Sequence, residues 1–79
     1  MNVYGLVLFA QNTQSFYQKH LTMAKEKQTW LQWFNHVKVW VLPTYRKEMG
    51  EPFDGMSIVD LGLVADALKA YYEEHIKEM

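Results

Sequence analysis

The sequence lacks cysteine altogether, which excludes disulfide bonds and thiolate metal sites. It is also poor in chain breakers, with two prolines and four glycines in 79 residues, and no linker or low-complexity tract divides it. The apolar stretch at residues 3–10 is far shorter than the roughly 20 residues of a membrane-spanning helix, and no Lys or Arg precedes it as in a signal peptide. We therefore expect one domain over residues 1–79, with this stretch in its core and no membrane partner. A cysteine-free chain also suits the reducing cytoplasm, which is the expected location.

The net charge of −1 points to no particular partner, but the charges are unevenly distributed. Residues 13–49 carry six basic and two acidic side chains, whereas residues 50–79 carry two basic and seven acidic ones. Either the basic segment packs against the acidic one, or one of these charged faces binds an oppositely charged partner. Both interpretations stay open at this point.

The clearest predicted helix spans residues 57–78. Ser57 and Asp60 form the pattern of a capping box, and apolar side chains then recur at steps of three and four residues. The segment 50–55, with two glycines and a proline, is expected to be the connection that precedes it.

A second helix is predicted to begin after Thr29, which stands three residues before Gln32 in another capping-box pattern. Apolar residues occupy one broad face of the segment that follows. Pro43 lacks the backbone N–H that a helix interior needs, so the helix either stops at Leu42 or kinks and continues to Met49. The helix-compatible residues after Pro43 favour the kink.

The first third of the chain is ambiguous. Residues 3–9 and 37–42 have strand-like composition, which allows an α+β fold with two short strands. A polar stripe at helical spacing between Gln11 and Glu26 instead favours one helix over residues 3–26. Three long helices with short connections predict an all-α fold, a small antiparallel three-helix bundle.

No pattern in the sequence indicates catalysis or a cofactor. The three histidines, His20, His36 and His75, include no pair at i and i+4, and the glycines form no phosphate-binding loop. Ser57 is explained as a helix cap, so it is a poor candidate nucleophile. We therefore expect a protein that is not an enzyme and that has no cofactor and no metal site.

The most unusual feature is the presence of three tryptophans within eleven residues. Large rings fill the core of a small bundle efficiently, but this many aromatic side chains are more than so narrow a core needs. We expect some of them to lie at a binding surface, where Trp, Tyr and Arg are the usual anchors. The candidate partner-binding residues on this face are Trp30, Trp33, Trp40, Tyr45, Arg46 and Lys47. An acidic alternative on the last helix consists of Glu73, Glu74 and Glu78.

These features predict a small protein-interaction module that acts as an adaptor, regulator or inhibitor of a larger protein or complex, in the size class of many small accessory proteins, including phage-encoded ones. The partner is expected to be another protein, or a nucleoprotein complex, and a homodimer would also cover surplus aromatic surface. The alternative is a nucleic-acid-binding accessory protein that uses the basic and aromatic side chains of residues 17–47.

Overall fold

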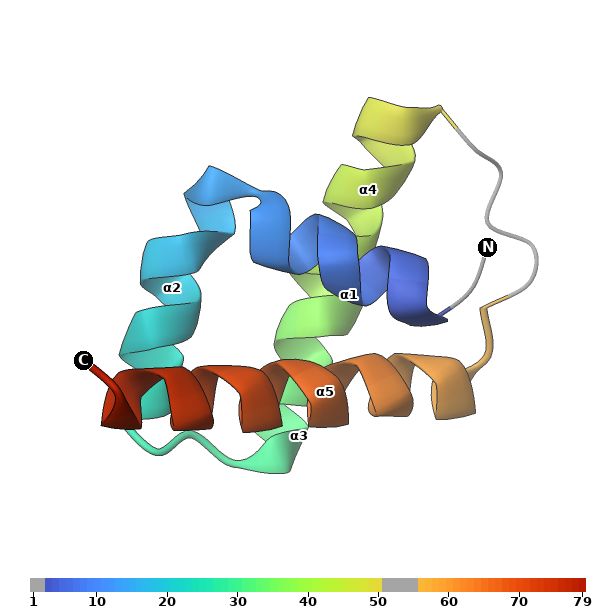
Figure 1. The fold of residues 1–79 in the computed structure, drawn as a ribbon. Helices are drawn as coiled ribbons and strands as arrows, with labels where there is room; N and C mark the ends of the chain where they lie inside the picture. The colour runs from blue at the N-terminus through green and yellow to red at the C-terminus, as the bar shows by residue number, and fades with distance from the viewer. Residues whose placement is uncertain (1–2, 51–55) are drawn as a thin grey trace.

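The computed structural model describes residues 3–50 and 56–79, and within these ranges the secondary structure is helical throughout (Figure 1). The elements are α1 (Val3–Asn12), α2 (Gln14–Lys25), α3 (Trp30–His36), the π-helical segment η1 (Val37–Val41), α4 (Leu42–Met49) and α5 (Ile58–Lys77). The all-α prediction is confirmed. The alternative with strands at residues 3–9 and 37–42 is wrong, because both segments are helical.

The helix predicted over residues 3–26 is broken at Thr13, so the predicted count of three helices is not confirmed. Thr13 has an extended backbone (φ −89°, ψ 109°), and its hydroxyl donates a hydrogen bond to the carbonyl of Phe9 at 2.6 Å. Threonine that bonds back to the preceding turn competes with the helical backbone pattern. The break redirects the chain, so that α1 lies over α5 while α2 descends in Figure 1.

The helix predicted after Thr29 does continue past Pro43 to Met49, as the helix-compatible sequence indicated. The irregularity is a π-helical turn, in which the N–H of Leu42 donates to the carbonyl of Val37, five residues earlier. This wider turn precedes a residue that has no N–H to donate. Gly50, in the left-handed conformation (φ 66°), ends α4.

Both capping boxes are confirmed. The hydroxyl of Ser57 accepts from the N–H of Asp60 at 3.1 Å, and the Asp60 carboxylate accepts from the N–H of Ser57 at 3.2 Å. Thr29 and Gln32 make the same reciprocal pair at 3.3 and 2.7 Å. Of the predicted connection over residues 50–55, Gly50 is described and the remainder lies outside the described residues.

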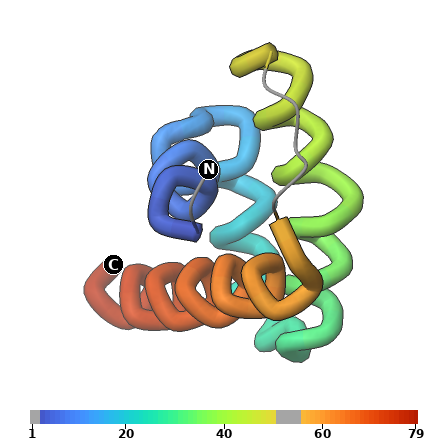
Figure 2. The backbone as a smooth tube through the Cα atoms, turned by 90° about the vertical axis from the view of Figure 1, so that its right-hand side faces the viewer, coloured from blue at the N-terminus to red at the C-terminus, as the bar shows by residue number. Residues whose placement is uncertain are grey.

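The predicted antiparallel arrangement of the helices is not confirmed. In Figure 1, α2 runs downward and the continuous helix α3–η1–α4 runs upward, while α5 crosses near the lower ends of both. Figure 2 shows α1 above α5 and the helix α3–η1–α4 along the right of the view. Helices α1, α2 and α3 all pack against α5. The core between them includes Leu6, Trp33, Val64, Leu68 and Tyr72, each at most 1% exposed.

Only one face of the apolar stretch at residues 3–10 is buried in the core. Leu6 and Ala10 are fully buried, but Tyr4 is 68% exposed and Leu8 is 38% exposed. The prediction that this stretch belongs to the core is therefore correct for its inner face alone.

Candidate functional site

The structure divides the predicted partner-binding residues between core and surface. Trp33 is fully buried, where its ring stacks on Tyr72 with centroids 6.2 Å apart, and Tyr45 is 8% exposed. These two rings are therefore part of the core and not of a surface. The indoles of Trp30 and Trp40 are 42% and 62% exposed. The charged candidates Arg46, Lys47, Glu74 and Glu78 are exposed, and Glu73 is half-buried.

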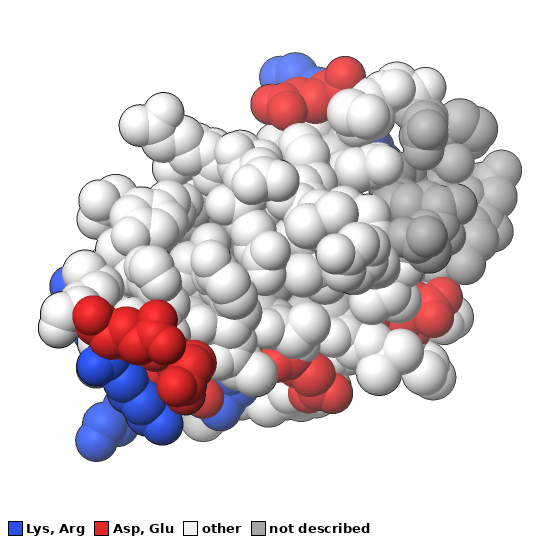
Figure 3. Space-filling view, in the orientation of Figure 1, with Lys and Arg blue, Asp and Glu red and all other residues white. Residues whose placement is uncertain are grey.

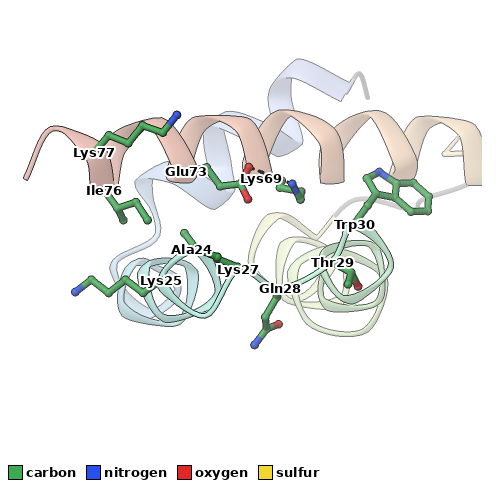
Figure 4. A pocket seen from close by; sticks show the side chains of 10 residues that line it. All are labelled: Ala24, Lys25, Lys27, Gln28, Thr29, Trp30, Lys69, Glu73, Ile76 and Lys77. Atoms are coloured by element: carbon green, nitrogen blue, oxygen red, sulfur yellow. Dashed lines mark hydrogen bonds and ion pairs between the residues drawn. The ribbon is translucent and has the colours of Figure 1, made fainter.

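Trp30 and Glu73 both line an open groove between α5 and the connection from α2 to α3, which has a volume of about 710 Å³ (Figure 4). We call it the Trp30 groove. Its lining consists of Ala24, Lys25, Lys27, Gln28, Thr29, Trp30, Lys69, Glu73, Ile76 and Lys77. In Figure 4, Trp30 stands at one end, Ile76 lies towards the other, and Lys69 and Glu73 lie between them along α5.

The connection between α2 and α3 gives the groove its lower wall, and its shape depends on Lys27. Lys27 has a left-handed backbone (φ 55°), the one non-glycine residue with this conformation in the described chain. Its N–H donates to the carbonyl of Ala24, and the N–H of Gln28 donates to the carbonyl of Met23, both at 3.0 Å. This is a Schellman turn with lysine at the position that usually holds glycine. It places Thr29 as the cap of α3 and so Trp30 as the first helical residue.

Gly62 and Phe34 hold the Trp30 ring in place. A Cβ atom on Gly62 would lie 3.3 Å from Cζ2 of Trp30, so the indole lies directly on α5 at a position without a side chain. The ring also stacks on Phe34, with centroids 5.2 Å apart and planes 22° apart. Because two elements fix the indole while 42% of its residue stays exposed, it is an ordered apolar surface at the end of the groove.

The groove carries an excess of positive charge. Its lining has four lysines and one glutamate. Lys69 is paired with Glu73 at 3.1 Å, and Lys77 lies 3.8 Å from Glu74 outside the groove. Neither Lys25 nor Lys27 has an ion pair with another described residue, and the side chain of Lys25 points outward in Figure 4. The site therefore combines an apolar floor, a fixed indole and cations near the α2–α3 connection.

The other candidates on the basic and aromatic segment lie away from this groove. Trp40 follows Trp30 by ten residues, which is about 15 Å along a helix. It lines two shallow hollows together with Lys19 and His36, on the side of the molecule where α2 faces η1. Trp30 and Glu73 thus line the same groove at different points along it, whereas Trp40 lies on another part of the surface.

Sequence reasoning missed a buried histidine pair behind the Trp40 surface. Nε2 of His20 and Nε2 of His36 are 2.9 Å apart, and the two residues are 0% and 7% exposed. Burial, reinforced by the positive charge that His36 would carry and by that of Lys19, lowers the pKa of His20 to about 3. Burial followed by Lys19 lowers the pKa of His36 to about 4. The pair is therefore neutral and holds α2 against α3.

A search for i,i+4 spacing could not reveal this contact, because the histidines are sixteen residues apart on different helices. The available signal is that both fall on the apolar faces of their helices. His20 lies beside Leu21, and His36 lies beside Val37, and both neighbours are buried.

Within residues 3–50 and 56–79, no three His, Asp or Glu side chains are grouped so that they could hold a metal ion. In the same part of the chain, no helix combines the length and the apolar character needed to cross a bilayer. Comparison with protein-family models, with curated proteins and with solved structures finds no match to this chain.

Proposed function

We propose that this protein is a non-enzymatic interaction module, an adaptor, regulator or inhibitor, that binds an acidic amphipathic segment of a larger protein in the Trp30 groove. The observation that supports it is the groove itself, whose lining combines a fixed, 42% exposed tryptophan at one end with four lysines and one glutamate. Apolar side chains of the partner would pack on Trp30 at one end of the groove and on Ile76 towards the other. The carboxylates of the partner would lie near Lys25 and Lys27.

Energetic considerations favour Trp30 as the anchor. Binding hot spots are enriched in tryptophan and occupy positions that a partner can desolvate completely. Trp30 is already half covered by Gly62 and Phe34, so a partner needs to cover only the remaining face. Its side-chain freedom is also already restricted, which lowers the entropy cost of binding.

The same charges offer less to a nucleic acid. Of the four lysines, Lys69 is paired with Glu73 and Lys77 lies beside Glu74, which leaves two for the several phosphate contacts that a nucleic acid needs. A short acidic peptide segment needs only the two lysines that have no ion pair. Nucleic-acid binding through residues 17–47 is therefore the competing outcome of the experiment below.

The test compares two exposed tryptophans. Partners are captured from the native host with the wild-type protein, and each is then titrated with the purified wild-type protein, Trp30→Ala and Trp40→Ala. We expect Trp30→Ala to weaken binding by about 2 kcal/mol, roughly thirty-fold, because an anchoring indole is lost. Trp40→Ala, which removes an indole that is more exposed, should change the affinity by less than about three-fold.

Circular dichroism and thermal melting of both variants establish that the fold is kept. Equal losses of affinity in the two variants, or no loss in Trp30→Ala, would contradict the assignment of the groove. Labelled DNA and RNA are titrated at two salt concentrations in parallel. Tight binding with a steep salt dependence would establish the nucleic-acid alternative instead.

A further inference from the structure

A second surface, on the opposite side of α5 from the Trp30 groove, carries no charge. The first 18 residues of the chain contain no Lys, Arg, Asp or Glu. Where α1 packs on α5, both helices expose apolar side chains, including Tyr4 at 68%, Leu63 at 49% and Tyr71 at 46% exposure. We call this surface the uncharged face. It consists of Tyr4, Leu8, Gln11, Leu63, Ala67 and Tyr71.

Figure 3 shows one broad face of the molecule on which charged side chains are sparse. White atoms extend over α1 and the upper side of α5, and charged atoms gather only along the borders. On α5, the helical period places Asp60 and Glu74 at the two ends of this stripe of apolar side chains and Asp66 beside it. Exposed apolar side chains that share a face without charges and are rimmed by charged groups are typical of an interaction site.

The charges around the face restrict what can cover it. A nucleic acid or an anionic membrane requires Lys or Arg, whereas the residues at its α5 edge are acidic. A charged protein surface would lose its hydration here without gaining a counter-charge, which is unfavourable. The electrostatic match is therefore a protein surface that is itself uncharged and apolar.

We propose that the uncharged face pairs with the same face of a second copy of this chain to form a symmetric homodimer. In a two-fold interface the same patch meets itself, so a face without charges creates no like-charge contacts at its centre. A stable interface covers about 800 Å² per subunit. That is about one sixth of the accessible surface of 5100 Å².

This inference goes beyond the proposed function and is independent of it, because the Trp30 groove lies on the other side of α5. Dimerisation would also compensate for the small core of a 79-residue domain, which buries a lower share of its surface than larger domains do.

The experiment measures the mass of the protein in solution by sedimentation equilibrium over a range of concentrations. The wild-type chain has a mass of 9.4 kDa and should approach twice that value at high concentration. Leu63→Glu and Leu8→Glu each place a charge in the uncharged face, and both variants should remain monomeric. Leu31→Glu is the matched control, because Leu31 is 58% exposed but lies on α3. This variant should dimerise like the wild type.

Circular dichroism verifies that each variant is folded. Because Leu8 and Leu63 lie on different helices, a local defect caused by one substitution would not explain the same result in the other. A wild-type protein that is monomeric at every concentration would overturn the proposal. So would a dimer that persists in both Leu63→Glu and Leu8→Glu. A dimer lost only in Leu31→Glu would assign self-association to the α3 side and would equally overturn it.

Discussion

The buried histidine pair is the contact on which the pH dependence of stability rests. His20 on α2 and His36 on α3 lie between the rings of Phe16, Trp33 and Tyr72, and Lys19 is the charged group that acts on both. Nδ1 of each histidine has no hydrogen-bond partner among the described residues. A proton added to the pair would therefore be poorly solvated, and folding favours the neutral form.

We expect stability to fall as the pH falls below 6.5. The pKa values of about 3 and 4 in the folded protein lie below the ordinary 6.5, so the unfolded chain binds more protons in this range. The contribution of the pair is fully present above pH 6.5 and is lost as the pH falls through the folded pKa values of about 4 for His36 and about 3 for His20. At pH 5 the loss is about 2 kcal/mol per histidine relative to neutral pH.

Urea unfolding at pH 5 and pH 7.5, at one fixed protein concentration, measures this loss. His36→Gln supplies a neutral, hydrogen-bonding side chain at one of the two sites. This variant should show about half of the wild-type difference between the two pH values. A wild-type protein that is equally stable at both pH values would show that the pair is not held neutral by the fold.

At the scale of single residues, the sequence identifies which side chains are unusual but not where they lie. All three tryptophans occur on one predicted helix, and periodicity alone cannot assign one to the core and two to the surface. The decisive factor for Trp30 is Gly62, thirty-two residues away, which leaves space for the indole on α5. Such a contact depends on how two helices cross, and local spacing does not contain that information.

Among the helices, those with strong caps were the predictable ones. The capping boxes at Ser57 and Thr29 fixed two starts, since each satisfies backbone N–H groups within four residues. The break at Thr13 has no comparable signal, because one threonine inside a helical pattern is tolerated in many helices. The arrangement of the helices also could not be predicted, because α5 contacts three helices at once and only the folded core determines how it crosses them.

The turn between α2 and α3 holds Lys27 in a left-handed conformation, so a substitution there should change both stability and partner binding. Lys27→Gly places glycine at this position, and glycine adopts the left-handed conformation without strain. We expect the free energy of unfolding to stay unchanged or to rise by up to about 1 kcal/mol, since relief of strain is partly offset by the entropy of glycine. Affinity for the acidic partner should fall by about three- to ten-fold, because a charge-assisted contact is lost.

Chemical denaturation and partner titration of the same sample provide the two readouts. Lys38→Gly, at an exposed helical position outside the Trp30 groove, serves as the control. It should lower stability by about 1 kcal/mol and leave the affinity unchanged. If Lys27→Gly binds the partner as tightly as the wild type, Lys27 does not contribute to the interaction.

For the molecule as a whole, the two proposed surfaces differ in their electrostatics and so should respond differently to salt. The Trp30 groove has an excess of three positive charges, whereas the uncharged face has none. Raising NaCl from about 0.05 M to about 0.5 M shortens the screening length from roughly 14 Å to roughly 4 Å. Partner binding should then weaken by about ten-fold, since the cations near Lys27 are exposed and easily screened.

Self-association should not weaken over the same range, because apolar burial does not depend on screening. Sedimentation equilibrium and partner titration at the two salt concentrations measure both responses on one preparation. If salt instead dissociated the dimer, the two copies would be held by charges, for example by the acidic end of α5 against the lysines of the Trp30 groove. The groove would then be occupied in the dimer, and the two surfaces could not work independently, since each copy would block the site at which the other binds its partner.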